Sequence, residues 1–124
     1  MGRIELLDLD GEIGSAKWHR EMVQVRLGQE PYLAITGEHK HAELLELFLK
    51  THGLPFELAT ERGEQVPARK GNGYLLVGAG FVLEKNGILY LYGSSASYNI
   101  RPDSIHAAEI SALEKRPLVI GELW

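Results

Sequence analysis

The sequence contains no cysteine among its 124 residues. This absence excludes a disulfide framework, a zinc site with cysteine ligands and catalysis by a thiol. No apolar run approaches the roughly 18 residues that span a membrane, and the opening residues MGRIELLDLD lack the apolar core of a signal peptide. We therefore expect a cytoplasmic protein that does not bind membranes.

Positive charge is also scarce. The chain has 13 Lys and Arg against 17 Asp and Glu, which gives a net charge of −4. This balance argues against a nucleic-acid partner, because such binding relies on a broad basic surface. The hydrophobic content of 44% is ordinary for a globular chain with one core, so we predict a single domain over residues 1–124.

The first half of the chain predicts a helix among short strands. A helix is expected over residues 38–52, ended by Gly53 and Pro55. The polar stretch 61–73 contains Gly and Pro and is expected to be a loop. Strands are predicted for 3–9, 22–27, 32–36 and 56–60.

The second half adds a hairpin and another helix. Two apolar runs flank Asn86-Gly87, a strong signal for a type I′ turn, and the second run predicts a strand from Ile88 to Tyr92. Residues 101–116 predict a helix with Asp103 as its N-cap, and 117–123 predict a final strand. The chain therefore predicts an α+β fold, with a largely antiparallel or mixed sheet and two helices.

His41 is the most informative of the histidines. A helix turns about 100° per residue, which places His41 on the same face as four apolar residues, namely Leu44, Leu45, Phe48 and Leu49. In the first turn, the positive end of the helix dipole favours a neutral ring, and exposed N–H groups attract an anion. A neutral imidazole suits a general base or a nucleophile. The alternative is a structural histidine bonded to a backbone carbonyl.

The neighbouring histidines predict no strong metal site. His39 and His41 are two residues apart, and helical positions at that spacing do not face each other. We therefore expect no metal and no cofactor. A weaker hypothesis is a metal site that uses His39 and His52 together with residues from elsewhere in the chain.

The segment LYGSSASYN at 91–99 is a second candidate for function. Small hydroxyl residues after a strand can direct several N–H groups toward one anion, although a flexible connection is the common alternative. The segment has no G-x-S-x-G motif, and GAG at 78–80 lacks the third glycine of a dinucleotide fingerprint. A triad of Ser95, His106 and Asp103 stays open, although the last two residues look more like a helix cap and first turn.

Together, these pieces resemble the Janus-type phosphohistidine phosphatases (the Janus/Ocnus family). The resemblance covers about residues 20–124. It rests on the order of KHAELLELF, the Gly-x-Gly at 78–80, YLYGSSASY, the helix with IHAAEIS and the terminal Trp124. It implies a catalytic role for His41, as base or nucleophile. It also implies that Ser95, Ala96 and Ser97 hold the phosphate, and that Arg20, or Lys17 as runner-up, supplies positive charge.

The chain departs from the family at two arginine positions. Phe81 and Thr36 stand where the family has arginine, and Arg69 and Lys70 are possible substitutes. Loss of positive charge weakens stabilisation of the transition state in phosphoryl transfer. We therefore expect either a metal-independent phosphatase for phosphohistidine or other N–P bonds, or a non-catalytic phosphate- or phosphopeptide-binding module. The expected partner is a phosphorylated protein or a small phosphoramidate.

Overall fold

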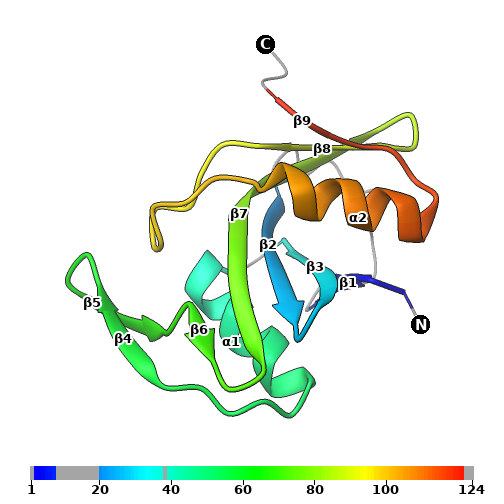
Figure 1. Ribbon diagram of the computed structural model, residues 1–124. Coiled ribbons are helices and arrows are strands. Elements are labelled where there is room, and N and C mark those ends of the chain that lie inside the picture. The colour runs from blue at the N-terminus through cyan, green and yellow to red at the C-terminus, as the bar shows by residue number, and fades with distance from the viewer. Residues whose placement is uncertain (1, 8–19, 38, 122–124) are drawn as a thin grey trace.

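The computed structural model describes residues 2–7, 20–37 and 39–121 and shows one α+β domain (Figure 1). Within these residues, no helix is long and apolar enough to cross a membrane. The elements follow one another as β1 Ile4–Leu6, β2 Arg20–Leu27, β3 Glu30–Thr36, α1 His41–Thr51, β4 Leu58–Glu61, β5 Glu64–Pro67, β6 Lys70–Gly71, β7 Tyr74–Lys85, β8 Ile88–Tyr92, α2 Ser104–Glu114 and β9 Leu118–Ile120.

The main sheet has seven strands and is mixed, as the sequence predicts. Its order is β1-β3-β2-β7-β8-β9, and β6 pairs with β7 beside this path. The outer pairs β1–β3 and β8–β9 are parallel. The other pairs, β2–β3, β2–β7, β6–β7 and β7–β8, are antiparallel. The long strands β2 and β7 therefore form the centre of the sheet.

The two helices pack on opposite faces of this sheet, one in front and one behind in Figure 1. Side chains alternate between the two faces along a strand. Val23 and Val25 of β2 belong to a core that includes Leu44 and Phe48 of α1. Met22, the residue before Val23, belongs to a second core with α2. Neighbouring residues of β2 therefore point to opposite faces of the sheet. Only those on the α1 face can reach a site beside that helix.

The predicted helix end, hairpin turn and helix cap are confirmed by the backbone conformation and hydrogen bonds. Gly53 follows α1 with φ of 68°, and Asn86 and Gly87 have φ of 53° and 80°, as a type I′ turn requires. The Asp103 carboxylate accepts the His106 N–H at 2.8 Å and so caps α2. Helix and hairpin ends are therefore set by short-range chemistry.

The predicted loop at 61–73 is wrong. Strands β4 and β5 form a hairpin there, and β6 follows it. The turn is Arg62-Gly63, with φ of 53° and 84°. Arginine is an unusual residue in the left-handed region, so this turn lacks the Asn-Gly signal of a hairpin. The first helix is also shorter than predicted and begins at His41.

Within the described residues, the second helix and the last strand are also shorter than predicted. Helix α2 covers Ser104–Glu114 within the predicted 101–116, and β9 covers Leu118–Ile120. The outer parts of the predicted strands 3–9 and 117–123 lie partly outside the described residues. Regular hydrogen bonding therefore ends before the apolar pattern does.

His106 is buried in this fold, and its burial predicts a dependence of stability on pH. Its ring lies 3.3 Å from both the Gln24 side-chain nitrogen and the Val25 carbonyl oxygen. Burial lowers the pKa of His106, only partly opposed by the Val25 carbonyl, which raises it. The unfolded chain therefore binds the extra proton first as the pH falls.

We expect the free energy of unfolding to be highest above the ordinary histidine pKa of about 6.5 and to fall as the pH drops below it. Urea unfolding between about pH 7 and pH 5 measures this slope. In His106→Gln, which cannot titrate, the slope should be shallower. An equal slope in both proteins would contradict this assignment to His106.

Candidate functional site

An open cleft of about 810 Å³ lies on the α1 face of the sheet. Its volume falls within the range of small-ligand sites. It is bounded by the start of β2, the start of α1, β7, the β4–β5 hairpin and the segment after β8. Its lining residues are Glu21, Lys40, His41, Glu61, Arg62, Glu64, Phe81, Ser94, Ser95, Ala96, Ser97 and Asn99.

His41 lies in the inner part of this cleft, as the first residue of α1, and is only 4% exposed. Its Nε2 lies 2.7 Å from the Gly80 carbonyl oxygen. A carbonyl can only accept, so Nε2 carries hydrogen, and Nδ1 is the ring nitrogen left for other contacts. The ring packs edge-on against Phe81, with 5.5 Å between centroids. His41 therefore has the bond to a backbone carbonyl that the structural alternative predicts, and it also lines the cleft.

Glu21 is the partner of His41 that the sequence analysis missed. Its Oε1 lies 3.3 Å from His41 Nδ1, and its side chain is 27% exposed. Burial raises the pKa of the Glu21 carboxyl, and the nearby His41 opposes this by lowering it. The Glu21 carboxylate therefore lies beside the His41 ring nitrogen that does not contact Gly80.

The register of the sheet explains why Glu21 faces His41. Glu21 pairs across the sheet with Thr36 of β3 on one side and with Phe81 of β7 on the other. Directly paired residues in adjacent strands present side chains to the same face. Thr36 and Phe81 therefore flank Glu21 in a single row on the face that carries His41.

The segment after β8 is an ordered turn rather than a flexible connection. Ser95 is 1% exposed, donates its N–H to the Ile100 carbonyl at 2.8 Å and accepts the Tyr98 N–H on Oγ at 3.1 Å. In the described part of the chain, the N–H groups of Ala96 and Ser97 have no hydrogen-bond partner. Ala96 and Ser97, which line the cleft, therefore carry two backbone donors without a partner, while Ser95 mainly holds the turn together.

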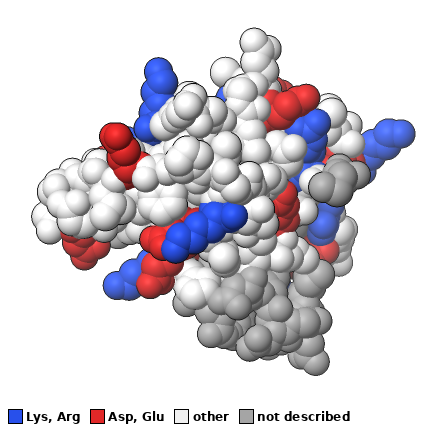
Figure 2. Space-filling model, turned by 90° about the horizontal axis from the view of Figure 1, so that it is seen from below, with Lys and Arg blue, Asp and Glu red and all other residues white. Residues whose placement is uncertain are grey.

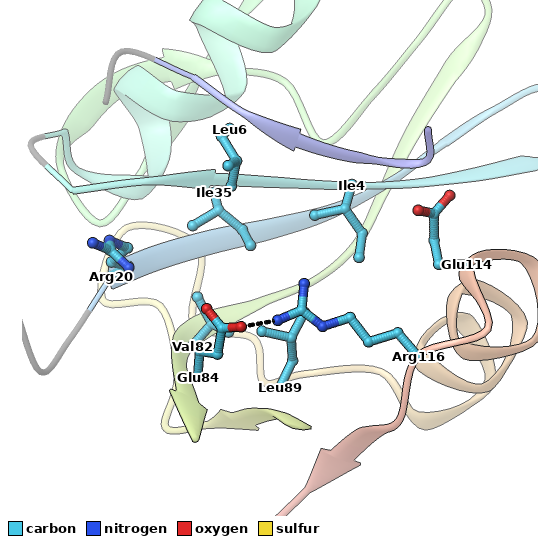
Figure 3. Close-up of a pocket in the computed structure, with 9 residues that line it drawn as sticks. All are labelled: Ile4, Leu6, Arg20, Ile35, Val82, Glu84, Leu89, Glu114 and Arg116. Atoms are coloured by element: carbon cyan, nitrogen blue, oxygen red, sulfur yellow. Dashed lines mark hydrogen bonds and ion pairs between the residues drawn. The ribbon is translucent and has the colours of Figure 1, made fainter. Parts of the chain in front are cut away.

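Arg20 does not lie with these residues, which corrects the expectation that it supplies charge beside His41. As the residue before Glu21 in β2, it points to the opposite face. There it lines a separate pocket of about 310 Å³ (Figure 3). That pocket has an apolar floor and a paired Glu84 and Arg116. The runner-up Lys17 lies outside the described residues.

Arg69 and Lys70 are also absent from the cleft lining. Arg69 donates to both carboxylate oxygens of Glu61, at 3.1 and 3.0 Å, and to the Tyr98 carbonyl. It thus ties the β4–β5 hairpin to the turn that holds Ala96 and Ser97. The cationic residues that do line the cleft are Lys40 and Arg62, which the sequence analysis did not single out.

The remaining histidines have other partners. His52 bonds the Glu5 carboxylate at 2.8 Å, and His39 lies 3.7 Å from Glu43. In the described parts of the chain, no group of three or more His, Cys, Asp or Glu side chains is placed to hold a metal. Both ring nitrogens of His106 contact groups other than Ser95, so the triad of Ser95, His106 and Asp103 is not assembled.

Charged side chains of both signs are found on one face of the molecule and in the cleft. On the face shown in Figure 2, basic and acidic side chains alternate among uncharged ones. In the cleft, Glu21, Glu61 and Glu64 face Lys40 and Arg62. A ligand of this cleft is therefore recognised by specific contacts rather than by a strong field of one sign.

No protein-family model matches the chain, and no curated protein matches it. Inferences about function therefore depend on the geometry of the cleft and on the chemistry of its residues.

Proposed function

We propose that the protein is a metal-independent phosphatase for N–P bonds, such as those of phosphohistidine, built on a phosphohistidine phosphatase-like domain. One observation carries the proposal. A buried histidine, bonded to Gly80 through Nε2, shares a cleft with two residues whose backbone N–H groups have no partner among the described residues. A base or nucleophile next to anion-binding donors is the minimal equipment for phosphoryl transfer without a metal.

The roles follow from the contacts. The N–H groups of Ala96 and Ser97 would bind phosphoryl oxygens, with the Ser95 hydroxyl as a further donor. His41 Nδ1 would take a proton from the attacking water, or attack phosphorus itself, while the bond from Nε2 to Gly80 holds the ring in place. Lys40 and Arg62 would supply charge at the cleft wall in place of Arg20.

An N–P bond suits such a modest site. Once its nitrogen is protonated, the amine is a good leaving group, and little further stabilisation of negative charge is required. A phosphate ester places more demand on cations that stabilise its transition state. The shortage of arginine near His41 is therefore less damaging for a phosphoramidate than for an ester.

The second candidate is a phosphate- or phosphopeptide-binding module without catalysis. It is favoured by the row of Thr36, Glu21 and Phe81 beneath His41, which contains no cation. Loss of charge at that row lowers catalysis more than it lowers binding, because negative charge increases toward the transition state. Binding through backbone N–H groups would persist.

Hydrolysis separates the two candidates. Purified protein is incubated with phosphoramidate or a phosphohistidine peptide in the presence of EDTA, and released phosphate is measured. We expect release well above the spontaneous rate, with EDTA making no difference. Binding of the phosphorylated ligand without any release would reject the phosphatase and leave the binding module.

A further inference from the structure

Glu21 brings a negative charge to the place where a phosphoryl group would meet His41. Its Oε1 is 3.3 Å from His41 Nδ1, and the backbone N–H of His41 also stabilises the carboxylate. An anion at the start of α1 would seek those same donors. Any ligand phosphoryl group that approaches Nδ1 therefore lies close to this carboxylate.

Among the described residues, no permanent cation at short range cancels the charge of Glu21. On its own strand and across the sheet, its neighbours in register are Thr36 and Phe81, which are uncharged. The remaining ionisable residues around it come from the start of α1 and from the opposite wall of the cleft: His39, Lys40, His41, Glu43, Glu61, Arg62 and Glu64. Of these, Glu61 is already paired with Arg69.

We propose that Glu21 makes the cleft select phosphoryl groups that are carried on a protonated nitrogen and reject phosphoryl dianions that lack a positive charge. This inference depends on the proposed binding of phosphoryl groups in the cleft. In the selected ligand, the cationic nitrogen lies against the Glu21 carboxylate while the oxygens meet the N–H groups of Ala96 and Ser97. The ligand would thus form an ion pair at its nitrogen and accept hydrogen bonds at its oxygens.

The selection assigns a role to a residue that would otherwise oppose the proposed reaction. A phosphate ester dianion is repelled by Glu21 and gains nothing in return. An N–P ligand gains an ion pair and, in the same contact, has its nitrogen kept in the protonated state that precedes release of an amine. Glu21 thus acts as a specificity-determining residue beside His41.

Two stable phosphonates test this selection without turnover. Methylphosphonate and aminomethylphosphonate share the same anionic group, and only the second has an ammonium group. The titrations are carried out at about pH 8, well above the ordinary carboxyl pKa of about 4.3. Calorimetric titration of the full chain with each ligand measures both affinities.

We expect the native protein to bind aminomethylphosphonate about tenfold more tightly than methylphosphonate. Glu21→Gln, which keeps the shape of the side chain, should bind both equally by gaining affinity for methylphosphonate. Glu64→Gln removes the same charge from the opposite wall and is the matched control, in which the preference should remain. Thermal unfolding verifies that both variants fold.

Equal affinities in the native protein, or a preference that survives in Glu21→Gln, would overturn the inference. So would failure of every variant to bind either phosphonate. The proposed function fails separately, through absence of phosphoramidate hydrolysis. If the protein hydrolyses phosphoramidate but shows no phosphonate preference, only the role of Glu21 is rejected. If it shows the preference without hydrolysis, Glu21 keeps its role in a binding module.

Discussion

Replacing His41 with alanine is expected to lower the rate of phosphoramidate hydrolysis about 100-fold or more, because loss of a general base typically costs 10²–10⁴ in rate. His41 is buried in the cleft, and its Nδ1 is the ring nitrogen that does not contact the Gly80 carbonyl. The backbone donors of Ala96 and Ser97 remain in the variant, so binding should fall less than turnover. Initial rates over a range of substrate concentrations separate the two effects.

The alanine variant also leaves the Gly80 carbonyl without its donor, which costs about 1–3 kcal/mol of stability. His41→Gln is therefore the sharper variant, since an amide can donate to that carbonyl but cannot act as a base. We expect Gln to recover stability and not activity. His52→Ala removes a histidine that bonds Glu5 outside the cleft and should leave turnover unchanged. Substantial activity in His41→Gln would show that His41 is structural.

Gly78→Ala is expected to lower the free energy of unfolding by about 3 kcal/mol. A Cβ at this position would lie 2.0 Å from Gln24 Oε1 and 2.8 Å from the Asp103 N. Gln24 is buried and bonds both the N and the O of Asp103, at 2.7 and 2.9 Å. The added methyl group would break these two bonds, and each buried polar group left unpaired is costly.

Urea unfolding measures the loss, and Gly121→Ala is the matched control. A Cβ at Gly121 would meet nothing within 4 Å, so we expect a change within about 0.5 kcal/mol. The GAG sequence at 78–80 thus has a packing role: it lets the segment before α2 cross β7 closely. If Gly78→Ala were as stable as the native protein, the contact between Gln24 and the start of α2 would not stabilise the fold.

Short-range patterns predicted much of the fold correctly. Helical periodicity placed His41 on the buried face of α1, and Asn86-Gly87 and Asp103 marked a turn and a cap. Each of these signals depends on residues within a few positions of one another. The α+β class with a mixed sheet followed from the order of the elements.

The composition of the site needed information that lies outside any short segment. Arg20 and Glu21 are adjacent, and only the register of β2 decides that Glu21 reaches His41 while Arg20 faces the other side. A shift of one residue would exchange them. The start of the strand, rather than the residue types, was therefore the missing information.

Two further features could not be read locally. The Arg62-Gly63 hairpin brings Arg62 to the cleft through a turn that arginine rarely forms. Ser95 has a pattern typical of an anion-binding loop, yet its N–H donates to Ile100. Of the residues that line the cleft there, Ala96 and Ser97 have N–H groups without a partner in the described chain. Long-range hydrogen bonds decided which donors remained.

The most direct test of this account locates the bound phosphoryl group. Amide signals of ¹⁵N-labelled protein are followed by NMR during titration with aminomethylphosphonate. We predict saturable shifts at Ala96 and Ser97 and at the start of α1, with the signals of Arg20 and Arg116 in the other pocket unchanged. Shifts that gather around Arg20 and Arg116, with Ala96 and Ser97 unaffected, would contradict the assignment of the cleft at His41 as the functional site.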